Sequence, residues 1–364
     1  MRVGLVIYGS LDTLSGGYLY DRKLVEALRA QGDTVEIISL PVKAYAGAVL
    51  QNFSMPIRRR LVNLKVDALL QDELNHPSLF WLNGWLRPKV KFPLIGIVHH
   101  LRSSEQHASW LLPLYRIIER QFLNSLDGYI FNSQSSQKAV EQLTSDPRPY
   151  VIATPGGDAL ESQVRGTKLN AHSLLIRRNE TQSRLEILFV GNLIERKGLH
   201  TLLEALRVVS KSDWHLRVVG RLDLDPGYTR RCQNLASQGG LAGKVEFLGA
   251  ITDAELIHTY QTSQLLVVTS SFEGFGIVYL EAMRWGVVTV GSTAGGAAEI
   301  IQHGKNGWLI EPGDSTALAG ILQTVCQNPE ILLSLSQAAR MTYERFPTWS
   351  ETTEKIRQFL LVQI

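Results

Sequence analysis

Cysteine is the rarest residue type in this sequence, with only Cys232 and Cys326 among 364 residues. Two thiols are too few for a disulfide framework or a cysteine-rich metal site, and they fit a reducing compartment. No apolar run approaches the roughly 20 residues that span a bilayer. The first ten residues, MRVGLVIYGS, lack the basic and apolar regions of a signal peptide. The sequence therefore predicts a cytoplasmic protein.

An excess of charge of one sign is also lacking. The chain carries 37 Lys and Arg against 34 Asp and Glu, a net charge of +3, which is too small to indicate nucleic-acid binding. The surplus of cations lies in residues 1–170, which hold 19 Lys and Arg against 15 Asp and Glu. This imbalance favours an anionic partner for the first half, either a phosphate group or a membrane surface.

Two segments of the basic half place cations beside aromatic side chains. Residues 57–61 contain three consecutive arginines, and residues 81–91 combine Trp81 and Trp85 with three cations. This pattern is compatible with peripheral contact with an anionic lipid surface, which is the less favoured of two interpretations. The alternative interpretation is a solvated face above tryptophans of the core.

The composition is that of an ordinary globular chain of about two domains, with 45% hydrophobic and 20% charged residues. Short β-like apolar runs alternate with helical stretches, which indicates parallel sheets. In the first half we expect strands at 3–8, 34–40, 66–70, 93–98, 128–131 and 150–153, and helices at 17–30, 77–86, 108–126 and 135–143. In the second half we expect strands at 186–190, 215–219, 245–248, 265–269, 287–290 and 307–310, and helices at 199–209, 228–238, 253–261, 275–285, 296–303 and 315–326.

The two halves are expected to form separate domains. Residues 161–184 are polar and poorly patterned, which predicts a linker. Two further helices close the chain, with a break near Pro347. Ligands of doubly wound α/β folds bind at the carboxyl ends of the strands, so two such domains can share a cleft.

The segment SFEGFGIVYLE at residues 271–281 carries the clearest chemistry. Glu273 is expected in a strand-to-helix loop, and Glu281 on a helix that starts near Phe275. Eight positions at about 100° per residue offset the two carboxylates by only ~80°. They suit the hydroxyl groups of a sugar and a ribose. The alternative is a glutamate that complements the helix dipole and a second glutamate on the surface.

This segment resembles the E-x7-E signature of retaining glycosyltransferases of the GT-B fold, in particular glycosyltransferase family 4. Other segments match motifs of that family in the same order: VIATPGGD at 151–158, GNLIERKG at 191–198, GGAAEI at 295–300 and NGWL at 306–309. The resemblance covers residues 185–345 closely and residues 1–160 more loosely. One departure is Asn192, where the family often has arginine.

The resemblance implies an α/β fold of GT-B architecture, with two Rossmann-like doubly wound domains that face a central cleft. Residues 1–165 would form an acceptor-binding domain, and residues 166–346 a domain that binds the nucleotide-sugar donor. Residues 347–364 would form a helix that packs back on the first domain.

Arg196 and Lys197 lie in a loop before a helix that opens at Gly198. Two cations beside a helix N-terminus fit a diphosphate and would stabilise it as a leaving group. The alternative is a pair of solvated surface cations. Gly274 and Gly276 leave free N–H groups at the start of the helix expected at 275–285, where a phosphate is favoured.

The resemblance assigns roles to these residues. Glu281 would hold the ribose hydroxyls, Arg196 and Lys197 the diphosphate, and Glu273 the hydroxyls of the transferred sugar. The remaining expected donor contacts are Gly16, Gly17, Ile251, Gly274, Phe275, Gly276 and Ile277.

His99 and His100 end a buried strand of the first half. The resemblance matches His99 to a catalytic histidine that helps to orient the donor sugar, although at least one of the two is expected to be structural. Asp72, His99 and Arg102 are the expected acceptor contacts. For Asp72 the alternative is helix capping.

No metal site and no cofactor are expected. The D-x-D triplet at Asp223–Asp225 resembles a metal-diphosphate motif of a different glycosyltransferase fold, but the following Pro-Gly favours a turn. No other cluster has convincing ligand spacing.

The sequence thus predicts a retaining, metal-independent hexosyltransferase. It would move a sugar from a UDP- or GDP-sugar to a hydroxyl acceptor in glycan, glycolipid or polysaccharide synthesis. The acceptor would be a sugar, a glycan or a lipid-linked sugar. The alternatives are a nucleotide-sugar-binding protein without transferase activity, an epimerase, and a phosphorylase with pyridoxal phosphate on Lys197.

Overall fold

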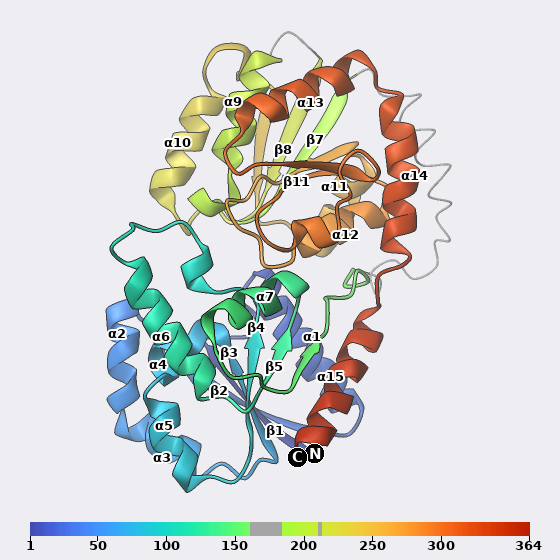
Figure 1. Cartoon of the computed structure of the whole chain (residues 1–364). Coiled ribbons are helices and arrows are strands. Elements are labelled where there is room, and N and C mark those ends of the chain that lie inside the picture. The colour runs from blue at the N-terminus through green and yellow to red at the C-terminus, as the bar shows by residue number, and fades with distance from the viewer. Residues whose placement is uncertain (161–183, 210–212) are drawn as a thin grey trace. The chain divides into compact units, whose positions relative to one another are not determined.

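The computed structural model describes residues 1–160, 184–209 and 213–364 (Figure 1). The chain divides into two compact units, one made of Met1–Gly156 with Pro347–Ile364 and the other of Gly157–Phe346. The expected boundary at 165/166 and nearly all of the expected linker lie outside the described residues. The predicted pair of doubly wound α/β domains is confirmed, since each unit holds a six-stranded parallel sheet with helices.

The sheet of the first unit has the strand order β2-β1-β3-β4-β5-β6, and every neighbouring pair is parallel. Its strands are β1 (Arg2–Tyr8), β2 (Thr34–Leu40), β3 (Ala68–Asp72), β4 (Leu94–Val98), β5 (Gly128–Phe131) and β6 (Tyr150–Ile152). All residues of β3, β4 and β5 are buried, as expected for short apolar strands covered on both faces. The strand order reverses direction between β1 and β3, which is the place where such sheets bind ligands.

The helices of the first unit follow the prediction only in part. They are α1 (Gly16–Ala30), α2 (Tyr45–Leu50), α3 (Met55–Val62), α4 (His76–Leu79), α5 (Leu82–Leu86), α6 (Leu112–Asn124) and α7 (Gln134–Leu143). The expected helix at 77–86 is two short helices, and α6 begins four residues late with a proline in its first turn. Helices α2 and α3 were not predicted, because they are too short to show a clear period.

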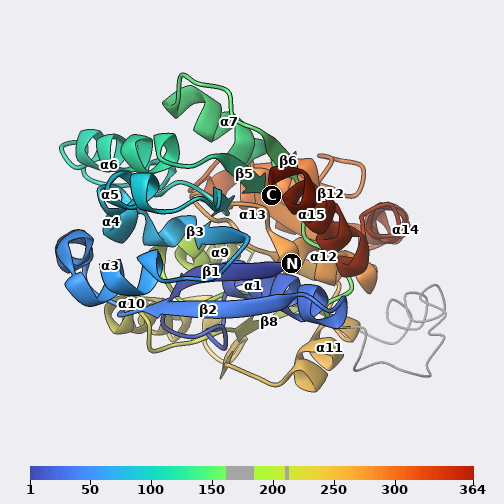
Figure 2. The ribbon, with the colours of Figure 1, turned by 90° about the horizontal axis from the view of Figure 1, so that it is seen from below.

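The last helix, α15 (Trp349–Gln363), packs on α1 of the first unit, as the resemblance implied (Figure 2). Asp33, just after α1, forms ion pairs with both the N-terminus and α15. Its carboxylate lies 2.7 Å from both the Met1 ammonium and Arg357 Nε, and the Asp33 side chain is almost fully buried. Burial acts to raise the pKa of Asp33, but the hydrogen bonds and charges of Arg357 and the N-terminus outweigh it and lower the pKa.

The sheet of the second unit has the order β12-β11-β10-β7-β8-β9, again all parallel. Its strands are β7 (Leu185–Val190), β8 (Trp214–Val219), β9 (Val245–Gly249), β10 (Leu265–Val267), β11 (Val288–Ser292) and β12 (Gly307–Ile310). Its helices are α9 (Leu199–Val208), α10 (Pro226–Ala236), α11 (Asp253–Gln261), α12 (Ile277–Arg284), α13 (Ser315–Gln327) and α14 (Ile331–Tyr343). The direction reverses between β7 and β10, so the loops after these two strands meet at one edge.

Two predicted elements of the second unit are corrected. The expected helix at 296–303 is only a 3-10 turn, Gly296–Glu299, and the helix expected from residue 275 begins at Ile277. Both errors fall where glycines open the segment, because Gly276 and Gly295 have positive φ and cannot continue a helix. No helix among the described residues is long and apolar enough to cross a membrane.

Candidate functional site

The loops after β7 and β10 bring together the charged side chains that the sequence singled out in the second half. Lys197 Nζ lies 2.6 Å from Glu273 Oε2, although 76 residues separate them in the chain. Ser270 Oγ donates a 3.0 Å hydrogen bond to the same carboxylate oxygen. Arg196 Nη1 donates a 2.8 Å hydrogen bond to the Phe272 carbonyl oxygen. These loops therefore form one charged constellation at the point where the strand order reverses.

The Glu273 carboxylate is held in its ionised form. Burial on its own would raise its pKa, but the positive charges of Lys197 and Arg196 and the hydrogen bonds from Lys197 and Ser270 outweigh that effect. The result is a Glu273 pKa lowered to about 2. A carboxylate that stays ionised at any physiological pH can accept hydrogen bonds from hydroxyl groups of a ligand.

Glycines let the backbones at this edge approach within contact distance. Gly198 has a φ of 72°, and a Cβ at this position would lie 2.2 Å from the Thr269 carbonyl oxygen. Gly295 has a φ of 95°, and its Cβ would lie 2.0 Å from the Glu273 carbonyl oxygen. A side chain at 198 would push the loop after β7 away from Thr269, and a side chain at 295 would displace the Glu273 backbone from the loop after β11.

The second glutamate of the expected pair is buried on α12. Glu281 is 6% exposed, and its Oε2 accepts a 3.0 Å hydrogen bond from the Tyr260 hydroxyl of α11. Burial raises the Glu281 pKa to about 7, although the Tyr260 hydrogen bond acts to lower it. The helical offset expected between the two glutamates does not apply, because Glu273 lies in an extended loop that pairs with Gly295.

The other expected donor residues surround the start of α12 or follow β9. Gly276 caps α12 with a φ of 94°, and Ile277 is its first residue. The Gly274 carbonyl and the Phe275 backbone pack against Gly296, while the Phe275 side chain is buried. Ile251 follows β9 and packs against the core of the second unit. The structure thus places Gly274 to Ile277 beside Glu273, whereas Ile251 follows β9 at another part of the sheet.

In the first unit, Gly16 and Gly17 open α1, with the Ser15 side chain as N-cap. A Cβ on Gly17 would lie 3.1 Å from His99 Cδ2, so the glycine loop and the His99 ring are in contact. The ring is almost fully buried and Nε2 lies 3.5 Å from Asp21 Oδ1. The His99 ring is therefore enclosed between Asp21 and the start of α1.

Asp72 acts as a cap, which was the alternative to its predicted contact with an acceptor. The side chain is fully buried, and its Oδ1 accepts a 2.9 Å hydrogen bond from the Leu74 backbone N–H. Its position at the end of β3 leaves no exposed oxygen for an acceptor. Arg102 packs against two aromatic rings. Its guanidinium carbon lies 5.2 Å from the Tyr45 ring centre and 5.0 Å from that of Tyr115.

The acidic triplet near α10 has a structural explanation. Arg221 pairs with Asp223 at 2.7 Å, and Asp225 caps α10 by accepting a hydrogen bond from the Tyr228 backbone N–H. Among the described residues, one group of carboxylates and imidazoles has ligand-type atoms all within 4.8 Å of one another, and it consists of Asp21, Asp72 and His99.

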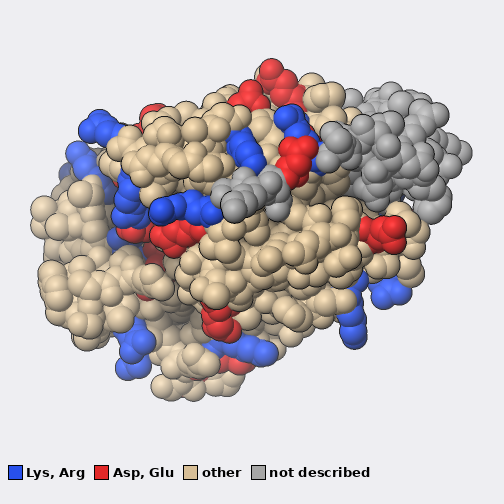
Figure 3. Space-filling view, turned by 90° about the horizontal axis from the view of Figure 1, so that it is seen from above, with Lys and Arg blue, Asp and Glu red and all other residues tan. Residues whose placement is uncertain are grey.

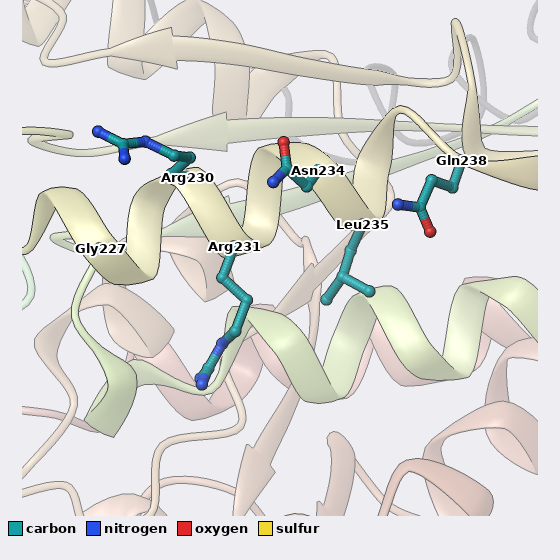
Figure 4. Close-up of a pocket in the computed structure, with 6 residues that line it drawn as sticks. All are labelled: Gly227, Arg230, Arg231, Asn234, Leu235 and Gln238. Atoms are coloured by element: carbon teal, nitrogen blue, oxygen red, sulfur yellow. The ribbon is translucent and has the colours of Figure 1, made fainter.

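A hollow on α10 is a surface feature distinct from these sites (Figure 4). Arg230 and Arg231 point to opposite sides of the helix, and Arg231 lies 2.7 Å from Glu195 in an ion pair. None of the expected site residues lines it. On the face drawn in Figure 3, side chains of both charge signs are interspersed, in keeping with the small net charge.

Several residues of these constellations were not identified from the sequence. Ser270 follows a predicted strand and Tyr260 lies in a predicted helix, and the pattern at both positions indicates only burial. Asp21 lies in a predicted helix and Glu73 directly follows a predicted strand, yet both are buried, and Glu73 Oε2 accepts a 3.0 Å hydrogen bond from the His99 backbone N–H. Only the weak signal of charged residues flanking apolar strand ends could have indicated them.

Residues 175–342 match the family model for glycosyl transferases group 1. The phosphatidyl-myo-inositol mannosyltransferase of Mycobacterium leprae is 28% identical over 98% of this chain and 95% of its own. The D-inositol 3-phosphate glycosyltransferase of Geodermatophilus obscurus is 28% identical over 79% of this chain and 68% of its own.

Solved structures of similar fold include sucrose-phosphate synthase from Thermosynechococcus elongatus, with a TM-score of 0.79, 21% identity and coverage of 98% and 97% of the two chains. HepE of Anabaena, crystallised in complex with UDP and glucose, gives a TM-score of 0.77 at 21% identity over 99% of both chains. These likenesses confirm the expected GT-B architecture.

The close approach at Gly198 gives a test of how the charged loops are held. We expect Gly198→Ala to lower the free energy of unfolding by about 2 kcal/mol or more, because the new Cβ meets a carbonyl and the residue keeps a left-handed conformation. Gly239→Ala is the matched control, since Gly239 has a φ of 57° with nothing within 4 Å. It should cost only the ~1 kcal/mol of the left-handed backbone. Equal urea midpoints for the two variants would show that the close approach is not needed.

Proposed function

We propose that the chain is a nucleotide-sugar glycosyltransferase of group 1, and that it transfers a hexose with retention of configuration and without a metal ion. The observation that carries this proposal is the contact of Lys197 with Glu273 at the reversal point of the second sheet. It puts a cation for phosphate next to a permanently ionised carboxylate for sugar hydroxyls.

We propose that the second unit binds the donor through three groups. Lys197 and Arg196 bind the diphosphate, Glu273 accepts hydrogen bonds from the sugar, and Glu281 accepts them from the ribose hydroxyls. The arrangement of the first three residues supports this, since all belong to the loops after β7 and β10. For Glu281 the support is a single buried carboxylate whose one described partner, Tyr260, leaves lone pairs for further donors. Backbone N–H groups at Gly274 to Ile277 would complete the site, with Ile251 near the base.

The proposed reaction is a front-face displacement. The acceptor hydroxyl oxygen bonds to the anomeric carbon on the side of the leaving group, while the bond from that carbon to the phosphate oxygen breaks. The hydroxyl proton passes to a phosphate oxygen of the departing diphosphate. Negative charge grows on that diphosphate, and the fixed charges of Lys197 and Arg196 stabilise it. Two cations in place at the leaving group are the reason for proposing metal independence.

The first unit is proposed to hold the acceptor near Gly16, Gly17, His99 and Arg102. The relatives from Mycobacterium and Geodermatophilus are described as acting on phosphatidyl-myo-inositol and D-inositol 3-phosphate. We therefore propose a polyol or sugar hydroxyl as acceptor, free or lipid-linked, and Arg102 as the cation that would meet an acceptor phosphate. His99 would act through its position under the glycine loop, since its ring is buried.

We also propose peripheral contact with anionic lipid through a surface cluster, here named the Trp81 patch, of Phe53, Arg58, Trp81, Trp85 and Lys89. Trp81 is 48% exposed and its ring lies 5.5 Å from that of Phe53, so the alternative of a core tryptophan is wrong for Trp81. Arg58 and Lys89 lie 4.8 Å and 4.1 Å from the Trp85 ring centre. Aromatic rings next to cations fit the headgroup region of a membrane. The cytoplasmic localisation stays a prediction.

The donor site predicts a charge-dependent affinity for one nucleoside diphosphate. In EDTA we expect UDP, GDP or ADP to bind in titration calorimetry, and Lys197→Met to weaken that binding about 10- to 100-fold through loss of a charge-assisted contact. Lys305→Met is the matched control, because Lys305 is an exposed lysine of the same unit. Unchanged affinity in Lys197→Met, with a native circular dichroism spectrum, would remove Lys197 from the site.

The stereochemical proposal predicts the anomeric form of the product. With the donor identified by calorimetry and an acceptor panel that includes inositol phosphates, we expect an α-linked donor to yield an α-linked product, read from the anomeric proton coupling by NMR. Glu273→Gln should lower kcat about 100-fold, since one charged contact to the transition state is lost. A β-linked product would contradict retention, and activity that returns only when magnesium is added would contradict metal independence.

The Trp81 patch predicts sedimentation with anionic vesicles. We expect Trp81→Ala to lower the fraction bound to phosphatidylglycerol vesicles several-fold, and 0.5 M salt to lower it for the unchanged protein by screening. Trp110→Ala is the control, because Trp110 is 75% exposed but lies outside the patch. Equal loss in both variants, or no binding by the unchanged protein, would refute the patch.

A further inference from the structure

Three titratable side chains meet in the buried interior of the first unit. Asp21 belongs to α1, Asp72 ends β3, and His99 follows β4. Asp21 and Asp72 have no exposed surface, and His99 is 5% exposed. Their ligand-type atoms all lie within 4.8 Å of one another, with His99 Nε2 3.5 Å from Asp21 Oδ1.

The cluster has more buried polar atoms than donors to satisfy them. Both oxygens of Asp21, Oδ2 of Asp72 and Nε2 of His99 have no hydrogen-bond partner. Two ionised carboxylates can only accept, so they cannot satisfy each other, and a pair of unpaired buried charges is costly. A proton on one carboxyl turns it into a donor for the other, which resolves both problems.

We propose that Asp21 and Asp72 share one proton at neutral pH, and that this protonated pair positions the His99 ring beneath the Gly16–Gly17 loop. Asp21 and Asp72 are then positioning residues, which act on the reaction through His99. The positioning role rests on the proposed function of His99 and the glycine loop, whereas the shared proton does not.

The electrostatics of the site agree with this geometry. Burial raises the pKa of Asp21 to about 7. Burial also raises that of Asp72, and the charge of Asp21 adds to the effect. Burial lowers the pKa of His99, although the charge of Asp72 opposes this, so the ring is neutral at physiological pH. A neutral imidazole offers a single N–H and cannot neutralise two carboxylates.

The surrounding groups supply no compensating charge. Tyr8 of β1 and Tyr18 of α1 face the pair, and Tyr20 places its ring edge-on to His99 at 5.3 Å. The hydroxyls of Tyr18 and Tyr20 are donated to the Tyr8 and Ala153 carbonyls. Glu73 is another buried acid beside Asp72. From α15, the group that packs on Tyr20 is the uncharged Trp349 ring.

The His99 backbone is already fixed, which leaves its ring for the pair to position. The His99 N–H donates to Glu73 Oε2 at 3.0 Å, and its carbonyl accepts from Ser136 Oγ at 2.8 Å. On its outer side the ring contacts Gly17. Loss of the shared proton at alkaline pH would put two like charges behind the ring, and their repulsion would move the ring or the glycine loop.

The shared proton is tested by carbon-13 NMR of the aspartate carboxyls of the full chain. We expect one carboxyl signal to titrate between about pH 6 and 8, and this transition to vanish in Asp21→Asn and in Asp72→Asn. Titration of all aspartates below about pH 5 would overturn the proposal. Stoichiometric metal in the purified protein, measured by mass spectrometry, would also overturn it, because a cation would then replace the proton.

Stability gives a second readout with an internal control of opposite sign. A carboxyl whose pKa is raised on folding makes stability fall as pH rises between the unfolded and the folded pKa. Asp21→Asn should therefore raise Tm at pH 8 relative to the unchanged protein by about 3 °C or more, and should gain less at pH 5. Asp33→Asn should lower Tm at both pH values, because Asp33 is ion-paired and its pKa is lowered. A loss of Tm at pH 8 in both Asp21→Asn and Asp72→Asn would contradict the shared proton.

The positioning role is tested by the pH profile of transfer. We expect kcat of the unchanged protein to fall about tenfold between pH 7 and 9 with little change in donor KM, and Asp21→Asn to flatten that decline. Identical alkaline profiles would overturn the positioning role, even where NMR shows the shared proton. Failure of donor binding by calorimetry would instead refute the proposed function and leave the NMR result standing.

Discussion

At the edge of the second sheet, the Lys197 ammonium and the Glu273 carboxylate lie 2.6 Å apart with both side chains mostly buried. This contact is only possible because the loops after β7 and β10 nearly touch, which requires glycine at 198, while glycine at 295 lets the loop after β11 approach the Glu273 backbone. The parallel strands bring the loops to the same edge of the sheet, and the glycines allow the loop backbones to come into contact. The sheet order, the glycines and the charge pair are thus parts of one constraint, on which the proposed donor site depends.

The first unit also places buried acidic side chains where its strand order reverses, but their surroundings differ from those of Glu273. Its reversal point lies between β1 and β3, where Gly17, Asp72 and His99 converge. In the second unit a cation neutralises the buried carboxylate and lowers its pKa. Among the described residues, no lysine or arginine contributes to the electrostatics of the buried acids Asp21 and Asp72 of the first unit, and their pKa values rise instead. The proposed donor site would therefore keep its charges over the physiological pH range, whereas the proposed shared proton would make the first reversal point sensitive to pH near neutrality.

The sequence was sufficient for what depends on local patterns and insufficient for what depends on contacts distant in the chain. Short apolar runs between helical stretches predicted both parallel sheets, because strands covered on both faces need apolar side chains throughout. Glu273 and Lys197 were found because family motifs surround them. Asp21 and Tyr260 were missed, since each lies on a helix whose period says only that one face is buried. Their partners in the buried clusters are Asp72 for Asp21 and Glu281 for Tyr260. These partners lie 51 and 21 residues further along the chain.

A buried ionisable group without a charged partner costs stability, and a fold under no other demand would replace it with an apolar residue. Glu281 is buried against a tyrosine hydroxyl, and Asp21 against another carboxyl, so neither is retained for stability. The ion-paired Asp33 shows what a stabilising buried carboxylate looks like in the same chain. Asp21 lies beside Asp72 and His99 at the carboxyl ends of β3 and β4, and Glu281 lies on the helix that follows β10. The places where this chain departs from the rules of stability are therefore the places where its fold is expected to bind substrates.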